Sequence, residues 1–272
     1  MGKTEPLLKY MHISVDDVYC ILKELTEGSY QSIYEHKVLK FLKNMHDKYG
    51  AVFSFYCFYH ISDADGWTLA NMTNRFRDEF KTAASWLKFG FHSNNSTIKY
   101  NEMVIPDEAL KHYNDVINAI KNFAGSSCVD RIPRIHFFSA AVENVRKWRD
   151  ANDGVEGFLA ADDNRELNYY LNDVERSFLQ NHSCYFEAKE NLYFLKTNFR
   201  LENIENAYKL LELEKQHKYA HEEAIKIVFT HEKFLYTDEI MCKIEDCCRW
   251  AIDNNYVFAF PMENILRCIT NT

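Results

Sequence analysis

The sequence predicts an α/β fold, a single (β/α)7–8 barrel with parallel strands over residues 1–272. Short apolar runs alternate with longer stretches of helical period, an order typical of βαβ units and a parallel sheet. The ends of these runs recur about every 35 residues, which suits the units of such a barrel. No Gly-rich phosphate-binding loop follows any run, which disfavours an open nucleotide-binding sheet.

Eight apolar runs are rich in aromatic or β-branched residues and have the length of buried strands. They are residues 9–15, 51–58, 86–91, 134–138, 157–161, 192–197, 225–230 and 256–260. Helical period is clear in four stretches, residues 33–49, 107–123, 202–220 and 238–254. Ser32 and Glu35 predict a capping box at the start of the first stretch, and Gly50 is well placed to end it.

Composition and charge limit the classes of function. The chain has 32 Lys and Arg against 40 Asp and Glu, so its net charge is −8. This charge repels phosphate backbones, and no nucleic-acid partner is expected. The longest strongly apolar run, residues 51–59, is too short to span a bilayer, so no membrane segment is expected. Because the N-terminus lacks the apolar core of an export signal, we expect a cytoplasmic protein.

Polar side chains gather where the predicted strands end, and in a barrel this edge carries the chemistry. The strand ends offer Asp16 and Asp17, His60 and Asp63, His92, His136, Asp162 and Asp163, Arg200, and His231 and Glu232. Histidine nitrogens and carboxylate oxygens bind Zn²⁺ and similar ions, and the same groups serve as general acids and bases. Asp16, Asp17, His92 and His231 come from three strand ends, which only a closed barrel or sheet would bring together.

Four segments resemble, in order, the motifs of the polysaccharide deacetylase superfamily, carbohydrate esterases with an irregular (β/α)7 barrel. MHISVDDV is similar to the Asp-Asp motif of that family, and FGFHSNNS resembles its His-Ser/Thr-x-x-His motif. DRIPRIHFF is similar to the third motif, which contains Arg and Pro, and VFTH resembles the final Leu-x-x-His motif. The resemblance covers residues 10–232.

The resemblance implies a metal-dependent enzyme with a divalent ion, zinc being the expected one. Asp17 and His92 match the family's positions for metal ligands. The second histidine of the second motif is absent, because Ser96 stands in its place. His136, one predicted strand further on, is the candidate for the third ligand.

The resemblance also implies the acid and the base of an amide hydrolysis. Asp16 would take a proton from the attacking water, and His231 would give one to the departing amine. Arg131 or Arg134 would orient the base, and Asp162 or Asp163 would support His231. The implied function is a hydrolase of C–N bonds that deacetylates an N-acyl sugar or a related amide.

Two other interpretations stay open. A metal-free hydrolase of the glycosidase type would use two carboxylates, such as Asp17 with Glu232 or Glu263. A barrel without catalytic activity would bind a carbohydrate or a partner protein, and Ser96 is the residue that keeps this interpretation open.

A small molecule or a carbohydrate is the expected partner in the hydrolase interpretations. Aromatic residues make up 15% of the chain, and most are expected in the core. Tyr56, Tyr59 and Trp67 lie near the end of the second predicted strand. They predict an aromatic wall against which a sugar ring could stack.

Overall fold

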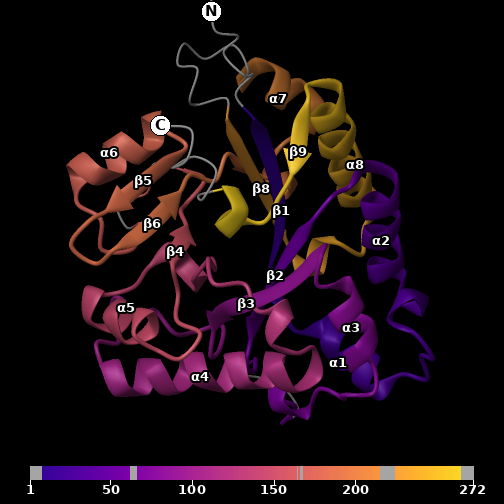
Figure 1. Ribbon diagram of the computed structural model, residues 1–272, viewed down its shortest axis with the longest axis horizontal. Coiled ribbons are helices and arrows are strands. Elements are labelled where there is room, and N and C mark those ends of the chain that lie inside the picture. The colour runs from indigo at the N-terminus through magenta and orange to yellow at the C-terminus, as the bar shows by residue number, and fades with distance from the viewer. Residues whose placement is uncertain (1–7, 62–65, 164, 166–167, 215–223, 265–272) are drawn as a thin grey trace, which may run out of the picture.

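The computed structural model describes residues 8–61, 66–163, 165, 168–214 and 224–264. Its centre is a parallel sheet with the strand order β3–β2–β1–β8–β7. A sixth strand, β9, joins this sheet by pairing with β1. These strands are β1 (Lys9–Val18), β2 (Phe53–Phe58), β3 (Leu87–Ser93), β7 (Phe199–Arg200), β8 (Ile225–His231) and β9 (Tyr256–Phe258). Figure 1 shows α2 and α8 along one side of this sheet and α4 beneath it.

A smaller sheet of three strands stands beside the first. Its strands are β4 (Gly157–Leu159), β5 (Cys184–Glu187) and β6 (Leu192–Leu195), in the order β4–β6–β5. The β4–β6 pair is parallel, whereas β5 and β6 form an antiparallel pair. The apolar pattern does not predict β5, because the sequence of this strand lacks the long apolar run of a buried strand.

Residues 129–135 connect the two sheets through single hydrogen bonds. The Asp130 N–H donates to the Phe89 carbonyl in β3 at 2.7 Å, and the Leu159 N–H in β4 donates to the Pro133 carbonyl at 3.0 Å. The predicted α/β fold with a mostly parallel central sheet is therefore confirmed. The strand pairs among the described residues form two sheets and not one ring, so the closure of the predicted barrel is not confirmed.

One of the eight predicted strands is wrong. Residues 134–138 contain a 3-10 turn, His136–Phe138, in which Phe137 and Phe138 have φ angles of 61° and 55°. These left-handed conformations are costly for residues with a large side chain, and they break an extended strand. Apolar composition alone does not distinguish a buried turn from a buried strand. The other seven predicted runs each overlap a strand.

The four predicted helical stretches each contain a helix, and four further helices were not predicted. The predicted ones are α2 (Lys37–Tyr49), α4 (Pro106–Phe123), α7 (Ala207–Glu214) and α8 (Asp238–Asp253); the others are α1 (Cys20–Glu27), α3 (Arg77–Ala83), α5 (Val142–Arg149) and α6 (Asp173–Asn181). Residues 215–220 of the predicted third stretch lie outside the described residues. Gly50 ends α2 with a φ of 71°, as predicted. Ser32 instead caps a 3-10 turn, Ile33–Glu35, that precedes α2.

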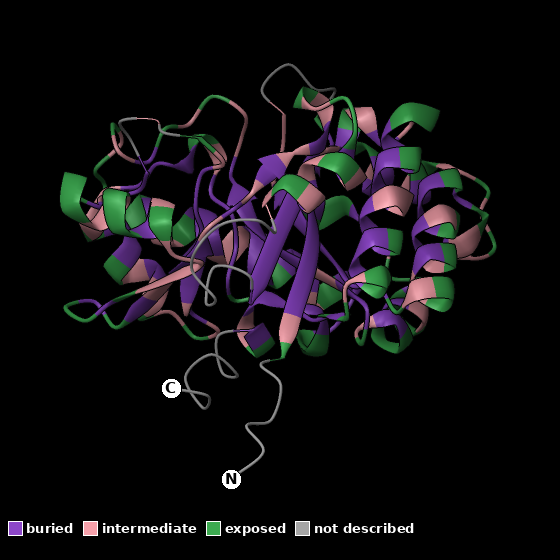
Figure 2. Ribbon diagram, turned by 90° about the horizontal axis from the view of Figure 1, so that it is seen from above, coloured by how far each residue is buried: buried purple, intermediate pink, exposed green. Residues whose placement is uncertain are grey.

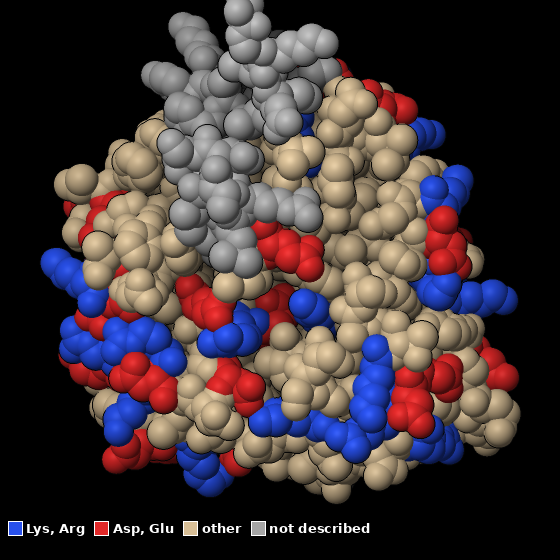
Figure 3. Space-filling view, in the orientation of Figure 1, with Lys and Arg blue, Asp and Glu red and all other residues tan. Residues whose placement is uncertain are grey.

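The core lies between the strands and the inner faces of the helices. Figure 2 shows the central strands buried, with helices that are buried on one side and exposed on the other. All six residues of β2 are buried, which explains its continuous apolar sequence. Basic and acidic side chains are interspersed on the face in Figure 3. None of the helices within the described ranges is long and apolar enough to cross a membrane.

Glu232 joins the end of β8 to the start of α1. Its carboxylate is 3% exposed and accepts hydrogen bonds from the N–H groups of Tyr19, Cys20 and Ile21, the last at 2.7 Å. These N–H groups have no partner within the helix, and a carboxylate at a helix N-terminus also meets the positive end of the helix dipole. Glu232 therefore fixes the helix that follows β1.

Replacement of this carboxylate should destabilise the protein. In Glu232→Gln, the amide nitrogen of the new side chain faces backbone donors, so at least one N–H loses its acceptor. We expect the free energy of unfolding to fall by about 1–3 kcal/mol, measured by urea denaturation. Glu27→Gln, at the exposed end of the same helix, should change it little. Equal stability of the two variants would contradict this role of Glu232.

Candidate active site

An irregularity in β1 brings two consecutive carboxylates to one edge of the sheet. The pairing of β1 with β2 shifts register between Val15 and Val18, and Asp17 has a φ of 61°. Consecutive residues of a regular strand point to opposite faces, so an undisturbed β1 would separate Asp16 from Asp17. Aspartate tolerates the left-handed conformation better than most residues. Asp16 meanwhile stays in register with His231 in β8.

Asp17, His92 and His136 form a compact cluster at this edge. The His92 Nε2 atom lies 3.1 Å from Asp17 Oδ1 and 3.1 Å from His136 Nδ1. His136 Nδ1 lies 3.6 Å from the same oxygen of Asp17. All three candidate ligand atoms fall within 4.8 Å of one another, a spacing at which they could hold one metal ion.

The outer nitrogen of each imidazole is occupied by a backbone carbonyl. His92 Nδ1 lies 2.6 Å from the Arg134 carbonyl oxygen, and His136 Nε2 lies 3.1 Å from that of Ser96. A carbonyl oxygen only accepts, so these two nitrogens carry the hydrogens. In the neutral rings the inner nitrogens then present lone pairs beside Asp17. Metal-binding histidines are held in this way by their outer nitrogen.

The protonation of the cluster favours cation binding. Burial of the His136 ring, helped by the neighbouring His92, lowers the pKa of His136 to about 4. Burial alone would raise the pKa of Asp17, but its hydrogen bond with His92, which exists only while His92 Nε2 carries a proton that a bound ion would displace, and the charges of the nearby imidazoles lower this pKa to about 2. At neutral pH the cluster thus contains an ionised carboxylate and a neutral His136, the states that a metal ion requires.

Arg134 holds Asp16 from within the fold. Its side chain is fully buried, and Nη1 donates to Asp16 Oδ1 at 2.9 Å and to Ser14 Oγ at 2.8 Å. Nη2 donates to Thr197 Oγ1 at 3.0 Å, and the guanidinium carbon lies 4.1 Å from the centre of the Phe229 ring. Asp16 Oδ2 makes no hydrogen bond to any residue in the described ranges.

His231 and Glu202 form the second ion pair of the site. His231 Nδ1 makes a short hydrogen bond with Glu202 Oε1, and Thr230 donates to the other carboxylate oxygen at 3.0 Å. Burial opposes protonation of the imidazole, but the bond to Glu202 and the charges of Asp16 and Asp17 outweigh it. The pKa of His231 is therefore raised above its usual value.

Known structures share this architecture, although the chain matches no sequence-family model and no curated protein. The Xyl-CE4 domain of a multidomain xylanase, from the hindgut metagenome of Trinervitermes trinervoides, is 9% identical, with a TM-score of 0.52 over 96% of this chain and 91% of that one. A family 4 acetyl xylan esterase from Clostridium thermocellum, in complex with a cobalt ion, is 11% identical, with a TM-score of 0.51 over 95% and 91%. The chain has the fold of the family 4 carbohydrate esterases.

Within this carbohydrate-esterase fold, most of the residues singled out from the sequence lie close together. The structure joins Asp17, His92 and His136 in one cluster, pairs Asp16 with Arg134, and places Asp16 beside His231 in register. Arg131 instead forms an ion pair with Glu156.

Among the described residues, Glu202 makes the hydrogen bond with His231 that was expected from Asp162 or Asp163. Asp162 forms two hydrogen bonds with Arg200, at 2.7 and 2.8 Å, and Asp163 pairs with Arg165. Glu202 takes the place beside His231. The sequence analysis assigned Glu202 to the start of a helix, whereas it lies in a 3-10 turn directly after β7. A carboxylate next to a strand end was the signal that could have identified it.

The Glu202–His231 pair allows a direct test by titration. In Glu202→Gln the imidazole loses its charged acceptor, so the pKa of His231 should fall, measured by NMR titration of the histidine ring protons. Glu205→Gln, which changes an exposed carboxylate nearby in the sequence, should leave this pKa unchanged. An unaltered His231 titration in Glu202→Gln would show that Glu202 does not hold the proton there.

Proposed function

We propose that the chain is a divergent member of the polysaccharide deacetylase superfamily, a metal-dependent hydrolase that removes the acyl group from an N-acyl sugar or a related amide. The observation that carries this proposal is the pair of histidines whose outer nitrogens meet backbone carbonyls while their inner nitrogens face Asp17. The shared fold supports it, since the solved structures with this fold include an acetyl xylan esterase in complex with cobalt.

Asp17, His92 and His136 would hold the ion, and His136 would replace the ligand that Ser96 cannot supply. Two imidazole nitrogens and one carboxylate oxygen suit Zn²⁺, the ion we favour, and leave room for substrate. When bound, such an ion polarises an acyl carbonyl and lowers the pKa of an attacking water. The Ser96 carbonyl still takes part, because it orients His136.

Asp16 would act as the general base. Arg134 fixes its Oδ1 atom, which orients the carboxylate and leaves Oδ2 to receive the proton of the attacking water. The guanidinium is itself held by Ser14 and Thr197. This arrangement restricts the motion of the base before substrate binds, so less entropy is lost as the reacting groups come together.

His231 would act as the general acid. Glu202 raises the pKa of the imidazole, which favours its protonated form, and occupies Nδ1, so Nε2 is the nitrogen that can donate to the departing amine. Asp16 and His231 are register partners on adjacent parallel strands. A proton acceptor and a proton donor therefore stand side by side at the same edge of the sheet.

The two other interpretations receive less support. Glu232 cannot serve as one carboxylate of a glycosidase pair, since both of its oxygens accept backbone N–H groups of α1. Glu263 accepts a hydrogen bond from the Phe260 N–H after β9. A barrel that only binds a ligand would not need the buried pair of Asp16 and Arg134. It would not need the pair of His231 and Glu202 either.

Metal content is the first test of this function. Wild-type protein incubated with zinc and passed through a desalting column should retain about one equivalent, measured by elemental mass spectrometry. Asp17→Asn, which tolerates the same backbone conformation, and His136→Gln should each weaken zinc binding by roughly tenfold or more. His182→Gln, in the loop after α6, should retain zinc like wild type. Wild-type protein without zinc after this treatment would rule out the proposed mechanism.

Hydrolysis is the second test. Asp16→Asn and His231→Gln should retain zinc, while kcat for acetate release from N-acetylated sugars falls by roughly 10²–10⁴-fold. In the active protein, kcat/KM should decline as the pH rises through the raised pKa of His231. Because Glu202 raises the pKa of His231, this decline should move to lower pH in Glu202→Gln. Unchanged turnover in both Asp16→Asn and His231→Gln would exclude the assigned acid and base.

A further inference from the structure

The face of β1 that carries Asp16 continues into the fold as a series of polar residues. His12, Ser14 and Asp16 are alternate residues of this strand, so their side chains point to the same side. Their register partners in β8 are Ile227, Phe229 and His231. Asp16 therefore forms the outer level of this face, Ser14 the middle level and His12 the inner level. The His12 side chain is fully buried.

The guanidinium of Arg134 occupies the outer and middle levels. Its Nη1 atom donates to Asp16 and to Ser14, and its Nη2 atom donates to Thr197. A guanidinium has five N–H donors, and one of them is on Nε. The Nε atom of Arg134 is buried and has no hydrogen-bond partner among the residues that the structure describes. Buried donors of charged groups nearly always have a partner, so this N–H indicates a further one.

His12 presents the complementary group. Its Nδ1 atom lies 3.2 Å from the Ala259 carbonyl oxygen, and because a carbonyl only accepts, Nδ1 carries the hydrogen. Burial of the ring and the nearby charge of Arg134 lower the pKa of His12 to about 3, so the imidazole is neutral at pH 7. The Nε2 atom is then an acceptor, and it too is buried and unpartnered within the described ranges.

The walls around these two atoms are largely apolar. One buried cluster receives residues from both sheets: Tyr56, Ile132, Leu159, Leu195 and Ile227. The Tyr56 ring lies 5.9 Å from the guanidinium carbon, and Ile227 is the register partner of His12, so the cluster borders both side chains. The Tyr56 hydroxyl donates to the Ile132 carbonyl at 3.0 Å. Tyr56, predicted for an aromatic wall beside the site, is instead fully buried here.

The chemistry of the two atoms determines what can lie between them. The missing partner accepts a hydrogen bond from Arg134 and donates one to His12. The guanidinium would repel a metal ion, and a fully ionised anion has no hydrogen to donate to Nε2. Water is the smallest neutral molecule that does both, and buried waters are held by polar groups of this kind.

We propose that a buried water molecule bridges Arg134 Nε and His12 Nε2 in the space between the two sheets, and that His12 positions Arg134 through this water. With the water in place, all three nitrogens of the guanidinium are held, which restricts its motion against Asp16. The positioning role rests on the proposed function, because Asp16 is the proposed base. The water itself is expected whatever reaction the protein carries out.

A high-resolution crystal structure of the metal-free protein tests the water directly. Density for one water should lie within about 3.2 Å of both Arg134 Nε and His12 Nε2. His12→Gln, whose side-chain oxygen can accept, should keep this water. His12→Leu should lose it, because a water in an apolar space needs at least two polar partners. Wild-type density without a water at these atoms, or the same water in His12→Leu, would overturn the proposal.

The protonation of His12 gives a second test, in solution. The ring nitrogens of His12, identified by their loss from the ¹⁵N NMR spectrum of His12→Gln, should show a hydrogen on Nδ1 and a lone pair on Nε2 at pH 7. A neutral ring with its hydrogen on Nε2 could not accept from the water, and this result would also overturn the proposal.

Kinetics test the positioning role. In His12→Leu, kcat for acetate release from di-N-acetylchitobiose should fall by roughly three- to tenfold, the effect of one lost hydrogen bond. KM and zinc content should stay the same, because His12 touches neither substrate nor metal, and His12→Gln should restore most of kcat. The control is Met11→Ala, which truncates a buried side chain on the opposite face of β1 and should lower stability without changing kcat. Wild-type kcat in His12→Leu, or an equal loss in Met11→Ala, would contradict the positioning role.

This inference and the proposed function fail in different ways. Protein that binds no zinc and hydrolyses no N-acetylated sugar, yet holds the water, would disprove the proposed function and keep the water site. Protein that binds zinc and hydrolyses the sugar without this water would keep the proposed function and disprove the inference.

Discussion

The buried guanidinium of Arg134 is the interaction on which the site depends. A charge that is fully removed from water is stable only where partners surround it, and Asp16, Ser14 and Thr197 provide them. The carbonyl of the same residue accepts from His92, and His136 lies two residues further along the chain. One segment thus connects Asp16, the proposed base, with His92 and His136, so a displacement of residues 130–136 would disturb all three.

The sequence predicted the strands and helices correctly wherever a single strand or helix periodicity continued without interruption. The buried strands β1, β2, β3 and β8 and the long helices α4 and α8 follow directly from apolar pattern and capping residues. It failed for residues 134–138, where an apolar segment is bent by two consecutive left-handed residues. It also could not reveal that single hydrogen bonds, not regular pairing, connect the two sheets, because such contacts depend on tertiary packing.

The candidate site, like the fold, could be predicted from the sequence only in part. Histidines and carboxylates at strand ends could be identified individually, and the meeting of Asp17, His92 and His136 agrees with the parallel arrangement that was expected. The sequence did not predict the partner of His231. Glu202 follows β7, and this strand has only two residues, too few for a recognisable apolar run.

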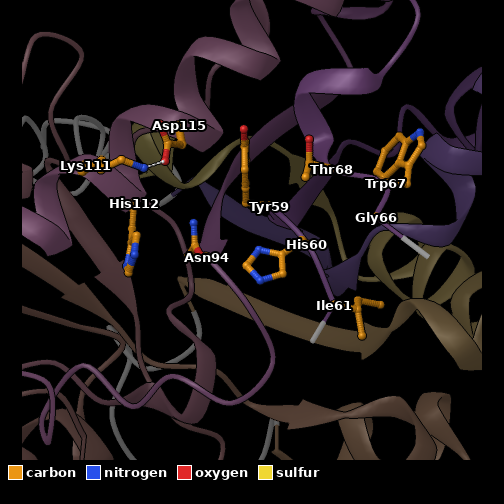
Figure 4. Close-up of a pocket in the computed structure, with 10 residues that line it drawn as sticks. All are labelled: Tyr59, His60, Ile61, Gly66, Trp67, Thr68, Asn94, Lys111, His112 and Asp115. Atoms are coloured by element: carbon orange, nitrogen blue, oxygen red, sulfur yellow. Dashed lines mark hydrogen bonds and ion pairs between the residues drawn. The ribbon is translucent and has the colours of Figure 1, made fainter. Parts of the chain in front are cut away.

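The register between Asp16 and His231 has a consequence for how such a protein changes its specificity. The spacing of Asp16 and His231, the proposed base and acid, is set by two adjacent strands, about 4.8 Å apart, in the most extensively paired part of the sheet. A cavity of about 370 Å³ past the ends of β2 and β3, in contrast, is formed by strand-end loops and one face of α4 (Figure 4). Loops tolerate insertion and substitution far better than paired strands. The loops around the site can therefore vary in sequence while the register that holds Asp16 beside His231 stays the same.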